Sequence, residues 1–115
     1  MELTNKHLLV LNLLKNNKDK YFKNKDIIHD IFFVHSVALK ELEIRQLISE
    51  LRNNGEPIIA DSNGYKFVDN VMKLKEYVSK RKYEIKKECI ALNRMCIKNN
   101  IQISLFDQEV FNENR

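Results

Sequence analysis

Hydrophobic residues recur with helical spacing over most of the chain, apart from a break between residues 54 and 69. A first helix is predicted from Thr4, which can cap it, to about Asn16. Its broad apolar face is made by Leu8, Leu9, Leu11, Leu13 and Leu14. A second helix is expected to start with Asn24 as its cap and to turn isoleucines inward, namely Ile27, Ile28 and Ile31.

The third predicted helix has the clearest apolar stripe, formed by Ile44, Leu47, Ile48 and Leu51. It ends at Asn53-Asn54-Gly55, because Gly55 can adopt the left-handed conformation that terminates a helix. Its start is left open by residues 32–39, which contain neither Gly nor Pro. Either Ser36 caps this helix, or the helix begins nearer Lys40.

A β-hairpin is predicted directly after this helix. Both glycines and the only proline of the chain, Gly55, Pro57 and Gly64, fall within ten residues. Pro57 suits the first position of an edge strand, and the β-branched Ile58 and Ile59 follow it. Residues 61–64 (Asp-Ser-Asn-Gly) supply the turn, and residues 65–68 return as the second strand.

A long fourth helix is expected from a cap at Asp69 or Asn70 to about Lys98. Its apolar seam repeats at seven-residue intervals through Val71, Val78, Ile85 and Leu92. The second half of the seam extends beyond what the preceding residues can cover. We therefore expect a homodimer that buries Val78, Ile85 and Leu92.

The segment IRQLISELRNNGEPIIADSNGY, in which a helix leads through a short loop into a hairpin with Gly-Tyr at its turn, resembles the winged helix-turn-helix family. Over about residues 4–98 the chain resembles short winged-helix proteins encoded by phages of Gram-positive bacteria. The resemblance implies a mainly α fold with a small β-hairpin wing (α+β). The expected organisation is a winged helix-turn-helix domain at 1–69, the long helix at 70–98 and a flexible tail at 99–115. It also implies a short first strand near residues 17–25, with Tyr21 and Phe22 at the sheet edge.

In this family the third helix docks in the major groove of duplex DNA and the wing touches the adjacent backbone. Arg and Gln can make bidentate contacts to bases, and Ser can reach phosphate. The candidate DNA-binding residues are Lys40, Arg45, Gln46, Ser49, Arg52 and Lys66. Relatives often carry a basic residue where this chain has Leu42, and three glutamates lie on the same helix, so a protein-binding role for the fold stays open.

A positive net charge suits a polyanionic partner, but where the cations lie along the chain is stronger evidence than their number. The chain has 115 residues, a net charge of +4 and a pI of about 9.1. Lys, Asn and Ile number 15, 14 and 12, a bias that an AT-rich genome produces without selection for DNA contact. The fourth helix, counted from Asp69, holds nine Lys or Arg against four acids. Those cations either meet phosphates or form a solvated face.

Nothing in the sequence indicates an enzyme, a metal site, a cofactor or a small-molecule substrate. His7, His29 and His35 have no partners arranged as in a catalytic triad. Cys89 and Cys96 lie ~10 Å apart along one predicted helix, which is too far for a disulfide bond. We interpret both as residues of the apolar seam. No signal peptide or membrane span is recognisable, so we expect a cytoplasmic protein that binds no membrane.

The tail carries the most specific motif. Its five residues resemble the pentapeptide with which many bacterial replication and repair proteins bind the sliding clamp: Gln102, Ile103, Ser104, Leu105 and Phe106. In such a peptide the Leu-Phe pair fills an apolar pocket and the Gln hydrogen-bonds at its rim. The alternative is that the pair folds back onto the domain.

The expected function is a non-enzymatic, phage-type DNA-binding accessory protein that engages the host clamp. The alternatives are a winged-helix transcriptional regulator, or an inhibitor of a host protein that does not bind DNA.

Overall fold

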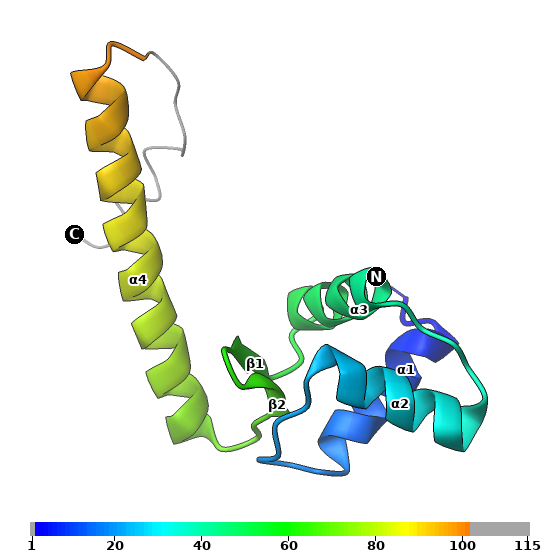
Figure 1. Ribbon diagram of the computed structural model, residues 1–115. Coiled ribbons are helices and arrows are strands. Elements are labelled where there is room, and N and C mark those ends of the chain that lie inside the picture. The colour runs from blue at the N-terminus through cyan, green and yellow to red at the C-terminus, as the bar shows by residue number, and fades with distance from the viewer. Residues whose placement is uncertain (1, 102–115) are drawn as a thin grey trace. The chain divides into compact units, whose positions relative to one another are not determined.

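The computed structural model describes residues 2–101 and is mainly helical, with one small antiparallel hairpin (Figure 1). Its elements are α1 (Asn5–Lys15), α2 (Asn24–His35), α3 (Glu41–Asn53), β1 (Ile58–Asp61), β2 (Gly64–Phe67) and α4 (Val71–Lys98). The chain forms two compact units, Met1–Leu74 and Lys75–Arg115. The first unit therefore holds α1 to β2, and most of α4 belongs to the second.

Helix α1 starts where the sequence predicted, with Thr4 and His7 capping each other. The Thr4 N–H donates to Nδ1 of His7 at 3.0 Å. The other ring nitrogen, Nε2, lies 3.6 Å from Oε2 of Glu50. Of the predicted leucines, Leu11 and Leu14 are buried and Leu9 and Leu13 pack against the core, whereas Leu8 is 43% exposed. His7 and Val10 complete the buried face, because they follow the helical repeat.

Helix α2 begins one residue earlier than expected. Asn24 is its first residue rather than its cap, and the backbone N–H of Lys23, at the cap position, donates to Asp26 Oδ2 at 2.9 Å. Ile27 and Ile31 are buried, as predicted, and Ile28 packs against the core from a partly buried position.

Of the two predicted starts of α3, the structure has the one next to Lys40. Ser36 does not cap α3; it ends α2 instead, with a left-handed backbone (φ 57°) and its N–H bonded to Phe32 O at 2.9 Å. Lys40 occupies the N-cap position of α3, and Leu39 just before it is buried in the core. The left-handed residue that ends a helix is usually Gly. Here Ser36 adopts this conformation, so the sequence contains no glycine to mark the end of α2.

The core of the first unit lies where α1, α2 and α3 meet the hairpin. All four residues of the α3 stripe, Ile44, Leu47, Ile48 and Leu51, are at most 6% exposed, as their spacing predicted. Helix α3 packs on both α1 and α2, and Ile58 and Phe67 close the core from the hairpin. Burying a side chain of this size contributes ~1.5–3 kcal/mol, so this stripe anchors α3 firmly.

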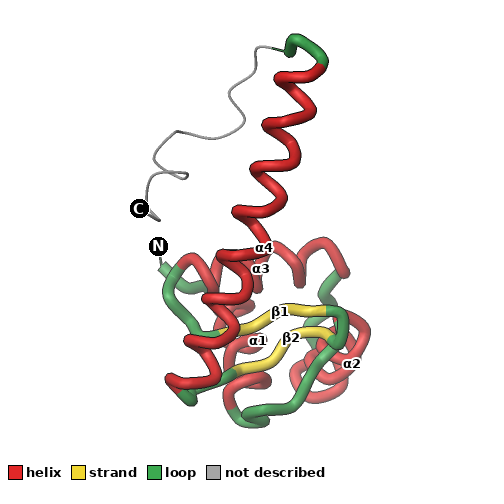
Figure 2. Tube along the Cα trace, turned by 90° about the vertical axis from the view of Figure 1, so that its left-hand side faces the viewer, coloured by secondary structure: helices red, strands yellow, loops and turns green. Residues whose placement is uncertain are grey.

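Strands β1 and β2 lie side by side and antiparallel (Figure 2). Ile58 pairs with Phe67 and Asp61 with Gly64. Gly64 has φ 121°, and a Cβ there would lie 2.5 Å from Phe22 O, so this position requires glycine.

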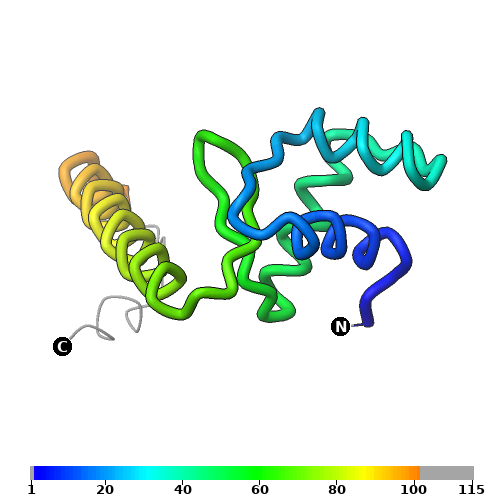
Figure 3. The backbone as a smooth tube through the Cα atoms, turned by 90° about the horizontal axis from the view of Figure 1, so that it is seen from below, coloured from blue at the N-terminus to red at the C-terminus, as the bar shows by residue number. Residues whose placement is uncertain are grey.

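The loop before α2 joins the hairpin. Phe22 and Tyr65 exchange two backbone hydrogen bonds of 2.8 Å, which brings this loop alongside β2 (Figure 3). The strand expected near residues 17–25 is thus a single bridge at Phe22.

Helix α4 is capped by Asn70 rather than Asp69. The Asn70 Oδ1 accepts hydrogen bonds from the N–H groups of Met72 and Lys73 at 3.0 and 3.1 Å. Asp69 instead pairs with Lys18 at 2.7 Å, which lowers the pKa of Asp69 and raises that of Lys18. Within residues 2–101, no helix has the length and apolar character needed to cross a membrane.

Candidate nucleic-acid interface

The outer face of α3 carries four of the predicted DNA-binding residues. Arg45, Gln46, Ser49 and Arg52 are all exposed, because they alternate with the buried stripe around the helix. The buried apolar face of α3 packs against the core, so the backbone that carries these exposed side chains is held in place. Lys40, at the N-cap, is also exposed.

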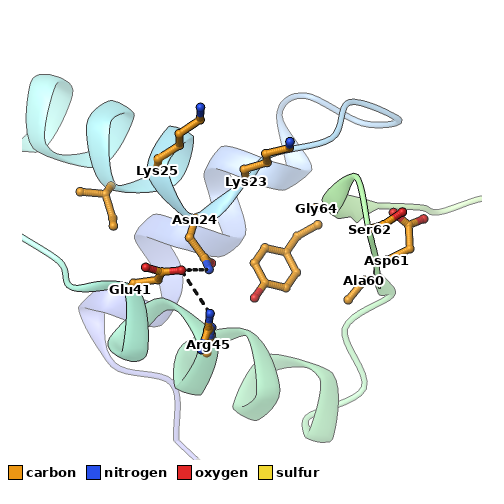
Figure 4. A pocket seen from close by; sticks show the side chains of 11 residues that line it. Lys23, Asn24, Lys25, Glu41, Arg45, Ala60, Asp61, Ser62 and Gly64 are labelled. Carbon is orange, nitrogen blue, oxygen red and sulfur yellow. Dashed lines mark hydrogen bonds and ion pairs between the residues drawn. The ribbon is translucent and has the colours of Figure 1, made fainter.

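A groove separates this face from the hairpin. It has a volume of about 500 Å³, and its lining includes Arg45, Ser49 and Arg52 of α3 and Tyr65 of β2. A second hollow of about 690 Å³ opens next to it, between α3, the hairpin and the start of α2 (Figure 4). Arg45 and Tyr65 line both, so the two form one continuous surface, which we call the α3–hairpin groove.

Two cations at the edge of this groove were not among the DNA-binding residues predicted from the sequence. Lys23 and Lys25 flank Asn24 at the start of α2 and line the larger hollow. The predicted helix start at Asn24 was the available signal, since backbone N–H groups at a helix N-terminus attract anions. Only the fold, however, places this N-terminus beside α3.

The charge of Arg45 is partly compensated within the protein. Its Nη2 lies 3.1 Å from Oε1 of Glu41, one turn earlier, and the same oxygen accepts a hydrogen bond from Asn24 Nδ2 at 3.2 Å (Figure 4). Both side chains of the ion pair are about three-fifths exposed. An ion pair this open to water contributes little, so Arg45 can exchange Glu41 for a phosphate or a base.

The other two acids of α3 lie next to side chains of α1. Glu43 pairs with Lys6 at 2.6 Å, and this hydrogen bond lowers the pKa of Glu43. Glu50 lies 3.6 Å from His7. The negative charge of Glu43 is therefore partly neutralised on the side of α1. Leu42, 66% exposed in the first turn, leaves that part of the surface apolar.

Lys66, the hairpin's only cation, rests against an aromatic ring. Its Nζ lies 4.4 Å from the centroid of Tyr21, and the Tyr21 hydroxyl donates to Asp61 Oδ2 at 2.7 Å. Tyr21 thus ties the two strands of the hairpin to the loop before α2 and holds the Lys66 stem.

Predicted seam residues on α4 are partly open to solvent, with Val78, Ile85 and Leu92 exposed by 41%, 43% and 36%. Cys89 and Cys96 are free thiols. The motif Gln102–Phe106 lies outside the described residues. Within residues 2–101, no group of three or more His, Cys, Asp or Glu side chains is placed to hold a metal ion.

Comparisons with protein-family models, curated proteins and solved structures find no match to this chain.

Proposed function

We propose that the chain is a winged helix-turn-helix protein that binds duplex DNA through the α3–hairpin groove and the exposed face of α3. The observation that carries this proposal is the grouping of Arg45, Gln46, Ser49 and Arg52 on one outward face beside a hairpin. The order α1, α2, α3, hairpin, with the Phe22–Tyr65 bridge as a vestigial first strand, supports the winged-helix assignment.

In this proposal α3 enters the major groove and the hairpin lies along the neighbouring backbone. Arg45 and Gln46 have the donors needed to read base edges, and Ser49 and Lys66 are suited to phosphate. Lys23 and Lys25 extend the phosphate-binding edge at the start of α2, where the helix dipole favours an anion.

The test is binding of a labelled duplex by fluorescence anisotropy. Arg45→Ala is expected to weaken binding by ~1–3 kcal/mol if Arg45 contacts a base. Lys15→Ala, which removes one exposed charge from the end of α1, is the matched control and should bind like the parent protein. Equal affinity of both variants, or no binding by the parent protein at low salt, would rule out this face as a DNA reader.

We further propose that Gln102–Phe106 docks this protein on the bacterial sliding clamp. The motif agrees with the clamp-binding pattern at all five positions and starts four residues after the end of α4 at Lys98. A short peptide must be ordered when it binds, so a dissociation constant near ~1 μM is expected. Together with DNA binding, this favours a replication accessory protein of the kind that phages encode.

Leu105→Ala/Phe106→Ala is expected to abolish clamp binding while duplex binding stays unchanged, because the two anchors fill the clamp pocket. The control is a peptide of residues 99–115 titrated against purified clamp. If neither the peptide nor the full protein binds, the replication role is lost and a winged-helix regulator remains.

One observation favours a protein-binding role for the domain instead. The last turn of α2 exposes Phe32, Phe33 and Val34 by 59%, 81% and 69%, while Ile31 in the same turn is buried. A helical turn that is apolar on all sides is usually covered. If Phe33→Ser abolished capture of a host protein and Arg45→Ala left DNA binding intact, this second role would replace the first.

A further inference from the structure

The positive charge of the protein is concentrated in one part of α4. Residues 75–98 contain eight Lys or Arg and three Glu, a net charge of +5, whereas residues 1–74 contain eleven Lys or Arg and ten acids, a net charge of +1. A lysine-rich composition would raise the charge of both segments. It does not explain why one helix holds more than the net charge of the whole chain.

Four of these cations form a straight line. Lys80, Lys87 and Arg94 are seven residues apart and Lys98 follows one turn later, so all four fall within a narrow sector of the helix. All four are exposed, and within residues 2–101 none of them has an acidic partner. We call this line the basic stripe.

Two acids lie one turn from Lys80 along α4, Glu76 before it and Glu84 after it. Glu84 lies between Lys80 and Lys87 along the chain, and its Oε2 is 2.7 Å from Nη1 of Arg81. This hydrogen bond raises the pKa of Arg81. The pair turns Glu84 toward Arg81 rather than toward the stripe. Within residues 2–101 neither Glu84 nor Glu76 forms an ion pair with a stripe residue.

The basic stripe is also separate from the apolar seam. At 3.6 residues per turn it lies about 150° around α4 from Val78, Ile85 and Leu92. A second copy that covers the seam would thus leave the stripe facing solvent. The same surface can bind a partner while the seam is occupied.

We propose that the basic stripe binds the phosphate backbone of a nucleic-acid duplex, as a surface distinct from the α3–hairpin groove. Seven residues of helix rise ~10.5 Å, about the rise of three base pairs, so successive cations meet a regularly charged polymer at a regular interval. Three of the stripe's four members are lysines, which act as point charges. Its contribution is therefore expected to come mainly from phosphate contacts, to depend little on sequence and to be sensitive to salt.

An anionic membrane surface fits α4 less well. Helices that lie in a membrane interface carry Trp, Phe or Leu on a continuous apolar face. Helix α4 contains neither Trp nor Phe, and its apolar seam is interrupted by Arg81 and Lys82 midway along its length.

The experiment compares two full-length variants that each lose three charges from α4. The stripe variant is Lys80→Gln/Lys87→Gln/Arg94→Gln, and the control variant is Lys75→Gln/Lys82→Gln/Lys86→Gln. Binding of a labelled duplex of arbitrary sequence is followed by anisotropy between about 50 and 200 mM salt. Circular dichroism verifies that α4 keeps its helix in both.

The stripe variant is expected to lose about 2.7 from the slope of log affinity against log salt, on the order of 10²-fold in affinity at low salt. The control variant is expected to lose clearly less. Lys75, Lys82 and Lys86 lie on another side of α4. Equal losses in the two variants would overturn the proposal, because the side of α4 that carries the charge would then make no difference to duplex binding. An unchanged stripe variant would overturn it as well.

Two further arms separate this proposal from its neighbours. Arg45→Ala/Arg52→Ala removes cations from α3 only, so a duplex-binding loss confined to that variant would sustain the α3 proposal and defeat the stripe. A loss confined to the stripe variant would do the reverse. Binding of the parent protein to vesicles of anionic lipid but not to duplex, lost in the stripe variant, would overturn the nucleic-acid assignment in favour of a membrane surface.

Discussion

Helices α3 and α4 are both amphipathic, but they differ in how their apolar sides are covered and where their charges lie. The stripe of α3 is at most 6% exposed, whereas the α4 residues Val78, Ile85 and Leu92 are 36–43% exposed. Arg45 of α3 shares its charge with Glu41, while Lys80 and Lys87 of α4 have no such partner within residues 2–101. The two proposals therefore assign base reading to α3, from its position and geometry, and phosphate binding to α4, from its net charge.

The largest expected difference between the two helices is in stability. Leu51→Ala removes a fully buried side chain of α3 and is expected to lower the free energy of unfolding by ~2–5 kcal/mol. Leu92→Ala, the same change on α4, should cost less than ~1 kcal/mol in the monomer, because Leu92 is partly exposed already. Urea unfolding measured by circular dichroism compares them. Equal losses of unfolding free energy for the two variants, in a dilute and monomeric sample, would contradict this expected difference between α3 and α4.

The second expected effect concerns what covers the α4 seam. If a second copy covers it, Ile85→Asp should give a monomer by light scattering, because burial of Ile85 contributes ~1.5–3 kcal/mol per chain. Tyr83→Asp changes an exposed residue away from the seam and should leave the dimer intact. A parent protein that is already monomeric at high micromolar concentration would contradict the homodimer.

A smaller effect tests how far Glu41 restrains α3. Glu41→Gln keeps an acceptor for Asn24 and Arg45 but removes the charge that holds Arg45. Duplex binding is then expected to tighten on the order of a few-fold at low salt, since attraction between exposed charges is weak and screened. Glu2→Gln removes the same charge from an exposed position and is the control. Weaker binding of Glu41→Gln than of this control would mean that Glu41 positions Arg45 productively.

The smallest expected effect is a shift in titration. Because Lys6 lowers the pKa of Glu43, the pair contributes stability above the ordinary Glu pKa of about 4.3, and this contribution is lost as the pH falls through the lowered value. In Lys6→Ala the Glu43 carboxyl should titrate at a higher pH, as followed by its NMR chemical shift. Lys15→Ala should leave that titration unchanged. An unshifted Glu43 in Lys6→Ala would show that α1 does not neutralise this acid of α3.

Local patterns along the chain predicted most of the fold. The helical spacing of Ile44 to Leu51 identified the buried side of α3, and Gly64 marked the turn of the hairpin. The end of α2 was not predicted, because Ser36 adopts a left-handed conformation that its residue type rarely takes. Four of the five leucines predicted for the apolar face of α1 are buried in the core or packed against it, and only Leu8 is exposed. His7 and Val10, which the prediction did not include, complete the buried face.

By itself, the sequence determined the helix and strand order, the exposed residues of α3, the α4 seam and the uneven distribution of charge, since these depend on residue type and spacing alone. Tertiary structure decided which of those residues meet. Asn24 reaches Glu41 across seventeen positions, and Tyr21 reaches Asp61 across forty. No periodicity encodes such pairs, because they form only when packing of the core brings α2, α3 and the hairpin together. The partial pairing of Arg45 and the Lys23–Lys25 edge of the groove therefore required the fold.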